Sequence, residues 1–258
     1  MAKKSVLMEE LTWYEYAERI QRDVILLPIG STEQHGPHLP LGTDAIQIMA
    51  FSKLAAERIG GIVAPVLSYG YKSQPKSGGG PNFPGTTCLG AEALMFIVRD
   101  IVKEFIRQGS KKICLMDGHY ENALFLSEAI DLALAETRDR EVKVLKNSFI
   151  EFLNEKDIQK LFPKGFPGWA LEHAAILETS LMLYFRPDLV KLDRMIPDKA
   201  ENLPPYDIYP VPKDIIPSSG ILADPSDASV EKGEYIVKRC LDEFEKCIRK
   251  EFGEKVQN

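Results

Sequence analysis

The chain has 258 residues, 45 % of them hydrophobic and 27 % charged, which is the composition of a globular protein. Its formal net charge of −6 argues against a nucleic-acid groove or a basic membrane face. No apolar run approaches the roughly 20 residues of a spanning helix, and the N-terminal segment lacks the apolar stretch of a signal peptide. The four cysteines form no C-x-x-C pair, so a reducing compartment is the default. We expect a cytoplasmic enzyme with a single domain over residues 1–258.

Strand-like and helix-like apolar patterns alternate along the chain. Buried strands are predicted over residues 24–29, 62–67, 112–116 and 141–145. Helices are predicted over residues 44–59, 91–108, 124–134 and 230–252. Repeated strand-then-helix units specify a parallel sheet covered on both faces by helices. The predicted fold class is therefore α/β, a three-layer α/β/α sandwich with a mostly parallel central sheet.

The stretch from Pro204 to Pro217 holds five of the 17 prolines. Proline lacks a backbone N–H and has a fixed φ, so this stretch cannot be a helix or a central strand. It is too rich in tyrosine and isoleucine for a flexible linker. We expect it to pack as an extended arm on its own domain or on a neighbouring subunit.

Two short segments combine histidine and glutamate directly after predicted strands. Glu33 and His35 are two residues apart, and His119 and Glu121 repeat that spacing. Residues two apart in extended backbone point to the same side, and the glycines and prolines after His35 allow the loop to bring Asp44 back to that side. In parallel α/β folds the ligand site lies beyond the carboxyl ends of the strands. Imidazole and carboxylate donors without cysteine suit a pair of zinc- or manganese-type ions bridged by a carboxylate.

Each of these residues has a simpler interpretation when taken singly. A lone histidine or glutamate in a loop is more often a satisfied hydrogen-bonding group than a metal ligand. Two clusters with the same spacing at equivalent fold positions favour the metal site.

A third segment could supply a general acid or base. Glu172 and His173 are followed by Glu178, and histidine titrates nearest to neutral pH. The alternative is a helix N-terminus with acidic residues near the positive end of the dipole. Trp169, among glycines and prolines, could be a lid, a stacking wall or a hydrophobic plug. The glycine-rich segment 71–80 lacks the order of a phosphate loop and suits a close backbone approach to a small ligand.

With these segments in place, the sequence resembles the creatininase (creatinine amidohydrolase) family, and within it the creatinine-hydrolysing branch. The resemblance runs from about residue 10 to the C-terminal helix. The matching motifs are Glu33-x-His35-Gly36 with Asp44, GHYEN at 118–122, YGYKSQ at 69–74, KSGGG at 76–80, FPGTT at 83–87, GW with EH at 168–173, ETSLML at 178–183 and PPYD at 204–207.

The resemblance implies a role for each matching residue. One divalent ion would bind Glu33, Asp44 and His119. A second, of zinc or manganese, would bind His35, Asp44 and Glu121, with Asp44 as the bridge. His173 matches the residue that transfers a proton, and Glu121 also belongs to the catalytic set. Four positions match those that line the substrate pocket: Ser77, Gly118, Tyr120 and Trp169. Members of this type are homohexamers built from dimers and take a small cyclic substrate.

The chain departs from the family pattern at two positions. Phe149 stands where a second pocket tryptophan is usual, and Asp117 stands where asparagine opens the second motif. Phenylalanine keeps an apolar face but has no indole N–H, so we keep Phe149 as a substrate-binding residue and note that the substrate could differ. The implied reaction is hydrolysis of the cyclic amide of creatinine to creatine. The alternatives are ring opening of a cyclic diketone such as 3-dehydro-scyllo-inosose, or a non-catalytic metal-binding assembly protein.

Overall fold

The computed structural model describes residues 5–137, 141–212 and 214–253. Within these residues the strands form one sheet in the order β2-β1-β3-β4, and every neighbouring pair is parallel. The strands are β1 (Ile25–Ile29), β2 (Ile62–Val63), β3 (Lys112–Asp117) and β4 (Lys143–Ser148). The predicted parallel sheet is confirmed.

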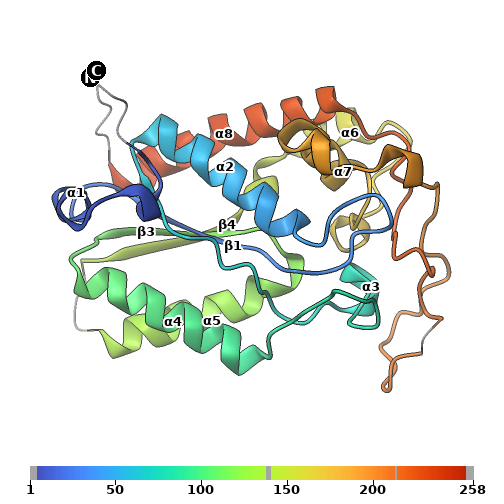
Figure 1. Ribbon diagram of the computed structural model, residues 1–258, viewed down its shortest axis with the longest axis horizontal. Coiled ribbons are helices and arrows are strands. Elements are labelled where there is room, and N and C mark those ends of the chain that lie inside the picture. Colours follow the sequence, from blue (N-terminus) through green and yellow to red (C-terminus); the bar gives the residue numbers. More distant parts are fainter. Residues whose placement is uncertain (1–4, 138–140, 213, 254–258) are drawn as a thin grey trace.

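The helices connect these strands and cover both faces of the sheet (Figure 1). The α-helices are α1 (Trp13–Arg19), α2 (Thr43–Ile59), α3 (Pro75–Gly78), α4 (Ala91–Arg107), α5 (Ala123–Glu136), α6 (Glu155–Leu161), α7 (Ile176–Phe185) and α8 (Val230–Phe252). Short 3₁₀ turns are η1 (Met8–Glu10), η2 (Tyr120–Asn122), η3 (Phe149–Phe152), η4 (Trp169–Leu171), η5 (Pro187–Leu189) and η6 (Leu192–Arg194).

Two hydrophobic cores lie on opposite faces of the sheet. Helices α4 and α5 lie together below the sheet in Figure 1, and α2, α7 and α8 lie above it. Along β1, Leu26 belongs to the core between the sheet and helices α2 and α8, whereas Ile25 and Leu27 belong to the core between the sheet and helices α4 and α5. Successive side chains of a strand point to opposite faces, so a continuously apolar strand fills both cores. The predicted three-layer α/β/α sandwich is confirmed.

The second strand is shorter than predicted. A strand over residues 62–67 is expected from its apolar run, but β2 ends at Val63, and Leu67 meets β1 only through an isolated bridge to Ile29. Pro65 has no N–H to donate to the ladder, which explains the early end. The fourth strand is displaced in the other direction and runs to Ser148 instead of ending at residue 145.

The proline-rich arm has neither helix nor strand in the part that the structure describes, residues 204–212 and 214–217. It runs along the end of the molecule that holds α3, on the right of Figure 1. The ammonium group of Lys76, in α3, donates to the carbonyl oxygens of Pro204 and Tyr206, so the predicted packing of the arm on its own domain is confirmed. None of the described helices is both long enough and apolar enough to cross a membrane.

Candidate metal centre

The carboxyl ends of β1 and β3 lie against the first turn of α2. A Cβ atom on Gly30 would lie 2.5 Å from the backbone nitrogen of Ala45, and one on Gly118 would lie 2.8 Å from Cβ of Ile48. Neither separation is possible for a larger residue without a shift of the helix, so these two glycines permit the close approach. As a result Asp44, in the first turn of α2, lies between the loops that follow the two strands.

Asp44, Glu33 and His119 converge at this edge of the sheet. Nδ1 of His119 lies 3.0 Å from Oε1 of Glu33 and 3.0 Å from Oδ2 of Asp44. All three side chains are buried, with at most 4 % of each residue exposed. Donors bound to one zinc ion at about 2.0–2.2 Å lie about 3 Å from one another, so the three atoms are spaced as ligands of one cation. This set is one of the groups in the described chain that could hold a metal ion.

Hydrogen bonds to the backbone fix the orientation of both imidazole rings. Nε2 of His119 lies 3.1 Å from the carbonyl oxygen of Tyr71, and Nδ1 of His35 lies 3.2 Å from the carbonyl oxygen of Glu33. A carbonyl only accepts, so these nitrogens carry the protons. The opposite nitrogens, Nδ1 of His119 and Nε2 of His35, face the carboxylates and offer lone pairs to a cation when the rings are neutral. Metal-binding histidines are commonly oriented in this way.

A second group of donors shares Asp44. Nε2 of His35 lies 2.9 Å from Oδ1 of Asp44 and 3.6 Å from Oε1 of Glu178, which is in the first turn of α7. These three residues form another candidate metal group, as do Glu33, His35 and His173. Asp44 thus presents one oxygen to His119 and the other to His35, the arrangement of a bridging carboxylate.

Several buried polar atoms of these groups have no hydrogen-bond partner. Among the described side chains they include Oε2 of Glu33, Nε2 of His35 and Oδ2 of Asp44. Nε2 of His35 and Oδ2 of Asp44 each lie 2.9–3.0 Å from a neighbouring donor or acceptor, yet the contacts lack hydrogen-bond geometry. Leaving such atoms unpaired in a protein interior costs about 1–3 kcal/mol each. Bound cations would satisfy all three, so the residues fit divalent metal ions.

The charges of the cluster shift the pKa values of its members. Burial alone would raise the pKa of Glu33 and of Asp44, but nearby imidazoles hold both pKa values below their usual range, those of His119 and His173 for Glu33 and those of His35 and His119 for Asp44. Burial alone would lower the pKa of His35 and of His119, but the surrounding carboxylates, Glu178 foremost for His35, raise both well above the usual value. Without a cation the cluster therefore binds protons, and metal binding must displace them.

Glu121 lies at the outer side of this cluster. Its Oε2 is 3.3 Å from Nε2 of His119, the nitrogen that faces away from Glu33 and Asp44. Its Oε1 accepts hydrogen bonds from Oγ of Ser77, at 2.6 Å, and from the backbone N–H of Gln74. The residue links the histidine to the α3 segment, and it belongs to none of the candidate groups found in the described chain.

His173 lies beside the cluster with one nitrogen already occupied. Its Nε2 is 2.8 Å from the carbonyl oxygen of Gln34, an acceptor, and 2.9 Å from the side-chain amide nitrogen of the same residue, a donor, so the two contacts call for opposite tautomers of the ring. Its Nδ1 lies 4.0 Å from Oε1 of Glu33, and its ring centroid is 4.5 Å from that of His35. Neighbouring Glu172 is buried, and burial raises the pKa of its carboxyl to about 8.

A cavity of about 310 Å³ adjoins the cluster on the side of Ser77. Ser77 and Tyr120 line it, together with Ala170 and residues of the proline-rich arm. Trp169, next to Ala170, is partly buried and makes an edge-to-face contact with Phe166, their ring centroids 4.8 Å apart. The structure thus brings Ser77 and Tyr120 together in one pocket.

Two further predicted substrate residues lie elsewhere. Gly118 packs against α2. Phe149 is 3 % exposed and stacks on Phe51 in the hydrophobic core, with ring centroids 4.4 Å apart. Asp117, the other departure from the family pattern, accepts hydrogen bonds from the backbone N–H of His119 and from Asn122, and burial raises its pKa to about 7.

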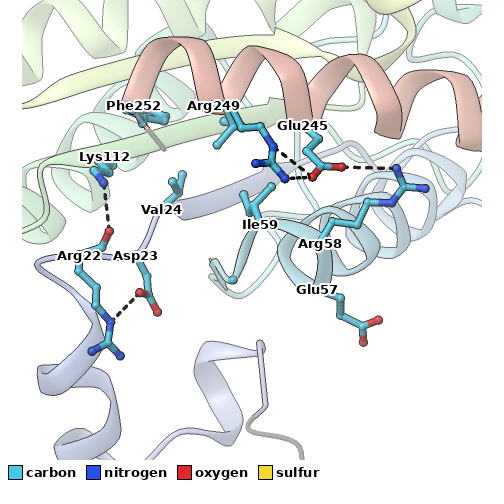
Figure 2. Close-up of a pocket in the computed structure, with 13 residues that line it drawn as sticks. Arg22, Asp23, Val24, Glu57, Arg58, Ile59, Lys112, Glu245, Arg249 and Phe252 are labelled. Carbon is cyan, nitrogen blue, oxygen red and sulfur yellow. Dashed lines mark hydrogen bonds and ion pairs between the residues drawn. The ribbon is translucent and has the colours of Figure 1, made fainter. Parts of the chain in front are cut away.

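A larger cavity, of about 350 Å³, opens at the opposite edge of the sheet (Figure 2). Its arginines have acidic partners. Arg22 pairs with Asp23 at 3.0 Å, and Glu245 accepts from Arg249 at 3.2 Å and lies 3.8 Å from Arg58. These ion pairs are typical of a solvated surface, so the volume of this cavity does not make it the reactive site.

Glu178 lies beside His35 as a further carboxylate that the sequence pattern did not place at this site. It lies more than 130 residues from Asp44 along the chain, and only the packing of α7 near α2 brings the two together. Its position in the first turn of a helix was the available signal, because a carboxylate is favoured at that end of the helix dipole.

Comparisons with known proteins identify relatives over nearly the whole chain. The sequence model of the creatininase family, creatinine amidohydrolase, matches residues 9–248. A creatinine amidohydrolase from Pseudomonas putida is 46 % identical over 255 residues, covering 96 % of this chain and 98 % of that protein. A mycofactocin precursor peptide peptidase from Mycolicibacterium smegmatis is 31 % identical, with 86 % and 85 % covered. A 3-dehydro-scyllo-inosose hydrolase from Thermotoga maritima is 26 % identical, with 95 % and 83 % covered.

Solved structures show the same similarity in three dimensions. A creatininase variant in complex with creatine superposes with a TM-score of 0.94 at 46 % identity, covering 97 % of this chain and 100 % of that one. A manganese form of creatininase gives the same values. A zinc–zinc form of the variant gives a TM-score of 0.95 at 45 % identity, covering 98 % and 100 %.

Proposed function

The chain belongs to the creatininase (creatinine amidohydrolase) family, and we propose that it is a metal-dependent hydrolase that opens the cyclic amide of creatinine to give creatine. One observation carries the proposal. The buried donors Glu33, Asp44 and His119 converge, and Oε2 of Glu33 and Oδ2 of Asp44 have no hydrogen-bond partner. A protein that needed only the scaffold would have no reason to keep such a set, which disfavours a non-catalytic assembly protein.

We assign two divalent cations, zinc or manganese, to the donors at this edge. Glu33, Asp44 and His119 would hold one of them. His35 and Asp44 would hold the other, with Glu121 as the third donor by resemblance to the family and Glu178 as the nearer carboxylate by geometry. When bound, such cations lower the pKa of water towards neutrality and polarise a carbonyl group.

Glu121→Gln and Glu178→Gln compare these two donors directly. The variant that loses about half of its bound metal identifies the third donor, because each substitution removes charge while keeping the size of the side chain. Equal, full metal content in both variants would contradict the assignment of a second cation to this pair of groups.

We assign the proton transfer to His173. Hydrolysis of a cyclic amide breaks the bond between the carbonyl carbon and the ring nitrogen, and that nitrogen must gain a proton as it leaves. Nε2 of His173 lies against the backbone carbonyl and the side-chain amide of Gln34, so Nδ1, which lies 4.0 Å from Oε1 of Glu33, is the atom that takes up and delivers the mobile proton.

The remaining predicted residues bind the substrate in this proposal. Ser77 and Tyr120 support this role by lining the cavity of about 310 Å³ beside Glu121. Trp169, Gly118 and Phe149 stay predictions from the family pattern. Of these three, Phe149 has the least support, because it stacks in the core on Phe51.

We infer further that the whole chain, residues 1–258, is one hydrolase domain that acts in the cytoplasm as a homohexamer without nucleic-acid or membrane partners. The net charge of −6 and the free state of Cys88, Cys114, Cys240 and Cys247 support this setting. Light scattering after size-exclusion chromatography tests the oligomer, and a monomeric mass would refute the hexamer.

The decisive experiment measures product from the purified protein with and without a chelator. We expect creatine from creatinine, loss of this activity after chelation, and its return with zinc or manganese. Other cyclic amides and a cyclic inositol-derived diketone complete the panel. Turnover of the diketone but not of creatinine would replace the proposed substrate with that of the more distant relative, and no turnover by a fully metal-loaded protein would refute a hydrolase.

A further inference from the structure

The proline-rich arm forms one wall of the cavity that Ser77 and Tyr120 line. Ile208, Val211 and Ile215 of the arm contribute apolar side chains to it. Ser77, whose hydroxyl donates to Glu121, also lines the cavity, and the arm adds Asp207 and Tyr209 beside its three apolar residues. A small ring bound beside the metal donors would have its outward substituents against the arm.

Lys76 fastens the first part of the arm to α3. Its ammonium group lies 2.7 Å from the carboxylate of Asp207 and donates to the carbonyl oxygens of Pro204 (3.3 Å) and Tyr206 (3.1 Å). An exposed ion pair by itself stabilises little. The two hydrogen bonds to backbone carbonyl oxygens add to this effect, because they hold the main chain of the arm and not only a flexible side chain. Lys76 also precedes Ser77 in the sequence, so the arm and the serine share one short segment.

The chain just after the arm, at Gly220 and Leu222, is hydrogen-bonded to the loops that carry Gln34 and His173. The buried side-chain amide of Gln34 donates to the carbonyl oxygens of Gly220 (2.9 Å) and Gly78 (3.2 Å). A Cβ atom on Gly220 would lie 2.0 Å from Oε1 of Gln34, so only glycine permits this contact. Two residues further on, the backbone N–H of Leu222 donates to the carbonyl oxygen of His173. Residues 204–207 of the arm and residues 220–222 just after it are therefore held by segments that carry site residues.

We propose that the arm is the specificity wall of the substrate pocket and that Lys76 is the positioning residue that holds it there. This inference rests on the proposed function, because it assumes that the reacting ring occupies the cavity beside Ser77. The apolar wall admits a small ring with a methyl-sized substituent and excludes rings with larger ones. Releasing the arm should weaken binding of the small ring and relax the exclusion, with little effect on the chemical step.

The test compares Lys76→Met with Lys72→Met in the metal-loaded protein. Lys72 is an exposed lysine of the same segment, and the described structure records no ion pair for it, which makes it the matched control. For Lys76→Met we expect KM for creatinine to rise by about tenfold, the scale of one lost charged hydrogen bond, while kcat changes by less than about twofold. Selectivity for creatinine over its N-ethyl analogue should fall. Lys76→Arg keeps the hydrogen-bond donors and the charge, so its KM for creatinine should lie close to the wild-type value.

Hydrogen exchange separates this proposal from the proposed function. In Lys76→Met the backbone amides of residues 206–212 should exchange faster than in the wild type and in Lys72→Met, whatever the substrate is. If the wild type opens another ring of the panel, the selectivity between that ring and an enlarged analogue of it is measured instead. In that case creatinine is refuted as the substrate, and the arm proposal is still tested. Unchanged exchange in the arm, or unchanged KM and selectivity in Lys76→Met beside faster exchange, would overturn the arm proposal while leaving the hydrolase intact.

Discussion

The two edges of the sheet treat charged side chains in opposite ways. At the carboxyl edge Glu33, Asp44 and His119 are buried and close together, and an oxygen of Glu33 and one of Asp44 have no hydrogen-bond partner. At the other edge Arg58 and Arg249 are partly exposed and paired with acids, around a cavity that is larger. Burying unpaired charge is costly, so it persists only where something outside the chain compensates it. Unsatisfied buried donors, and not cavity size, are therefore the reason for placing the proposed reaction at the carboxyl edge.

Removal of the bridging carboxylate should have the largest effect. Asp44→Ala takes away the donor shared by both candidate cation groups, so we expect loss of bound metal and of detectable hydrolysis together. Elemental analysis and a creatine assay measure the two losses. Asp242→Ala, which removes the partner of Arg58 at the other edge, is the control and should keep both. Near-full metal content in the Asp44 variant would contradict the assignment of Asp44 as the carboxylate that both cations share.

His173→Ala should slow the reaction without emptying the site. The residue holds no cation in the proposed arrangement, so metal content should match the wild type while kcat falls by something like 100- to 10,000-fold, the loss typical of a general acid–base. Loss of metal from this variant would mean that His173 is a ligand, as the candidate group with Glu33 and His35 allows.

Phe149→Trp distinguishes a core residue from a pocket residue. Because Phe149 stacks on Phe51 inside the core, the larger indole should overpack it and lower the free energy of unfolding by about 1–3 kcal/mol, with kcat/KM for creatinine unchanged. Chemical denaturation and steady-state kinetics measure the two quantities. A higher kcat/KM at unchanged stability would instead show that this position touches the substrate, as the family pattern predicts.

The sequence predicted the long amphipathic helices and the strands β1 and β3 well, and it predicted helix α7 and the bounds of β2 and β4 poorly. The spacing of apolar residues identified α2, α4, α5 and α8 to within one or two residues, because each has one buried and one solvated face. Helix α7 was missed as an element because it carries no polar stripe. Leu177, Leu181 and Met182 are buried, and so are Thr179 and Ser180 between them.

The site shows the same division. Residues two apart after a strand could be predicted to share a side, and the positions of Glu33, His35, Asp44 and His119 at one edge agree with that expectation. The approach of Glu178 could not be predicted, because it depends on how α7 packs in three dimensions and no local pattern records that.

Acid should act on a buried carboxylate far from the metal centre. Asp157 accepts hydrogen bonds from the hydroxyl of Tyr235 (2.6 Å) and from Arg239 (3.0 Å), and although burial opposes it, these partners hold its pKa below the usual value. Because the folded-state pKa is lowered, the ionised carboxylate stabilises the folded protein at pH values above the unfolded-state pKa of about 3.9. This stabilisation is lost as the pH falls below that value and through the lower folded-state pKa.

Asp157→Asn should therefore cost about 1–2 kcal/mol of unfolding free energy at pH 7. The difference from the wild type should shrink as the pH falls below about 4, where the carboxylate of the unfolded wild type takes up its proton while that of the folded protein is still ionised. Urea unfolding at about pH 7, 4 and 3 measures it. A difference that stays constant over this range would show that shape rather than charge stabilises the contact.

The smallest effect should come from the edge that carries no chemistry. Arg58 pairs with Asp242 at 2.6 Å, but 36 % and 46 % of these side chains are exposed, so the solvent screens the pair. Arg58→Ala should change the free energy of unfolding by less than about 1 kcal/mol. Because the cavity of Figure 2 lies at the opposite end of the strands from Asp44, kcat and KM for creatinine should stay at their wild-type values. A loss of activity in this variant at full metal content would mean that the second edge communicates with the first, and the contrast between them would no longer locate the function.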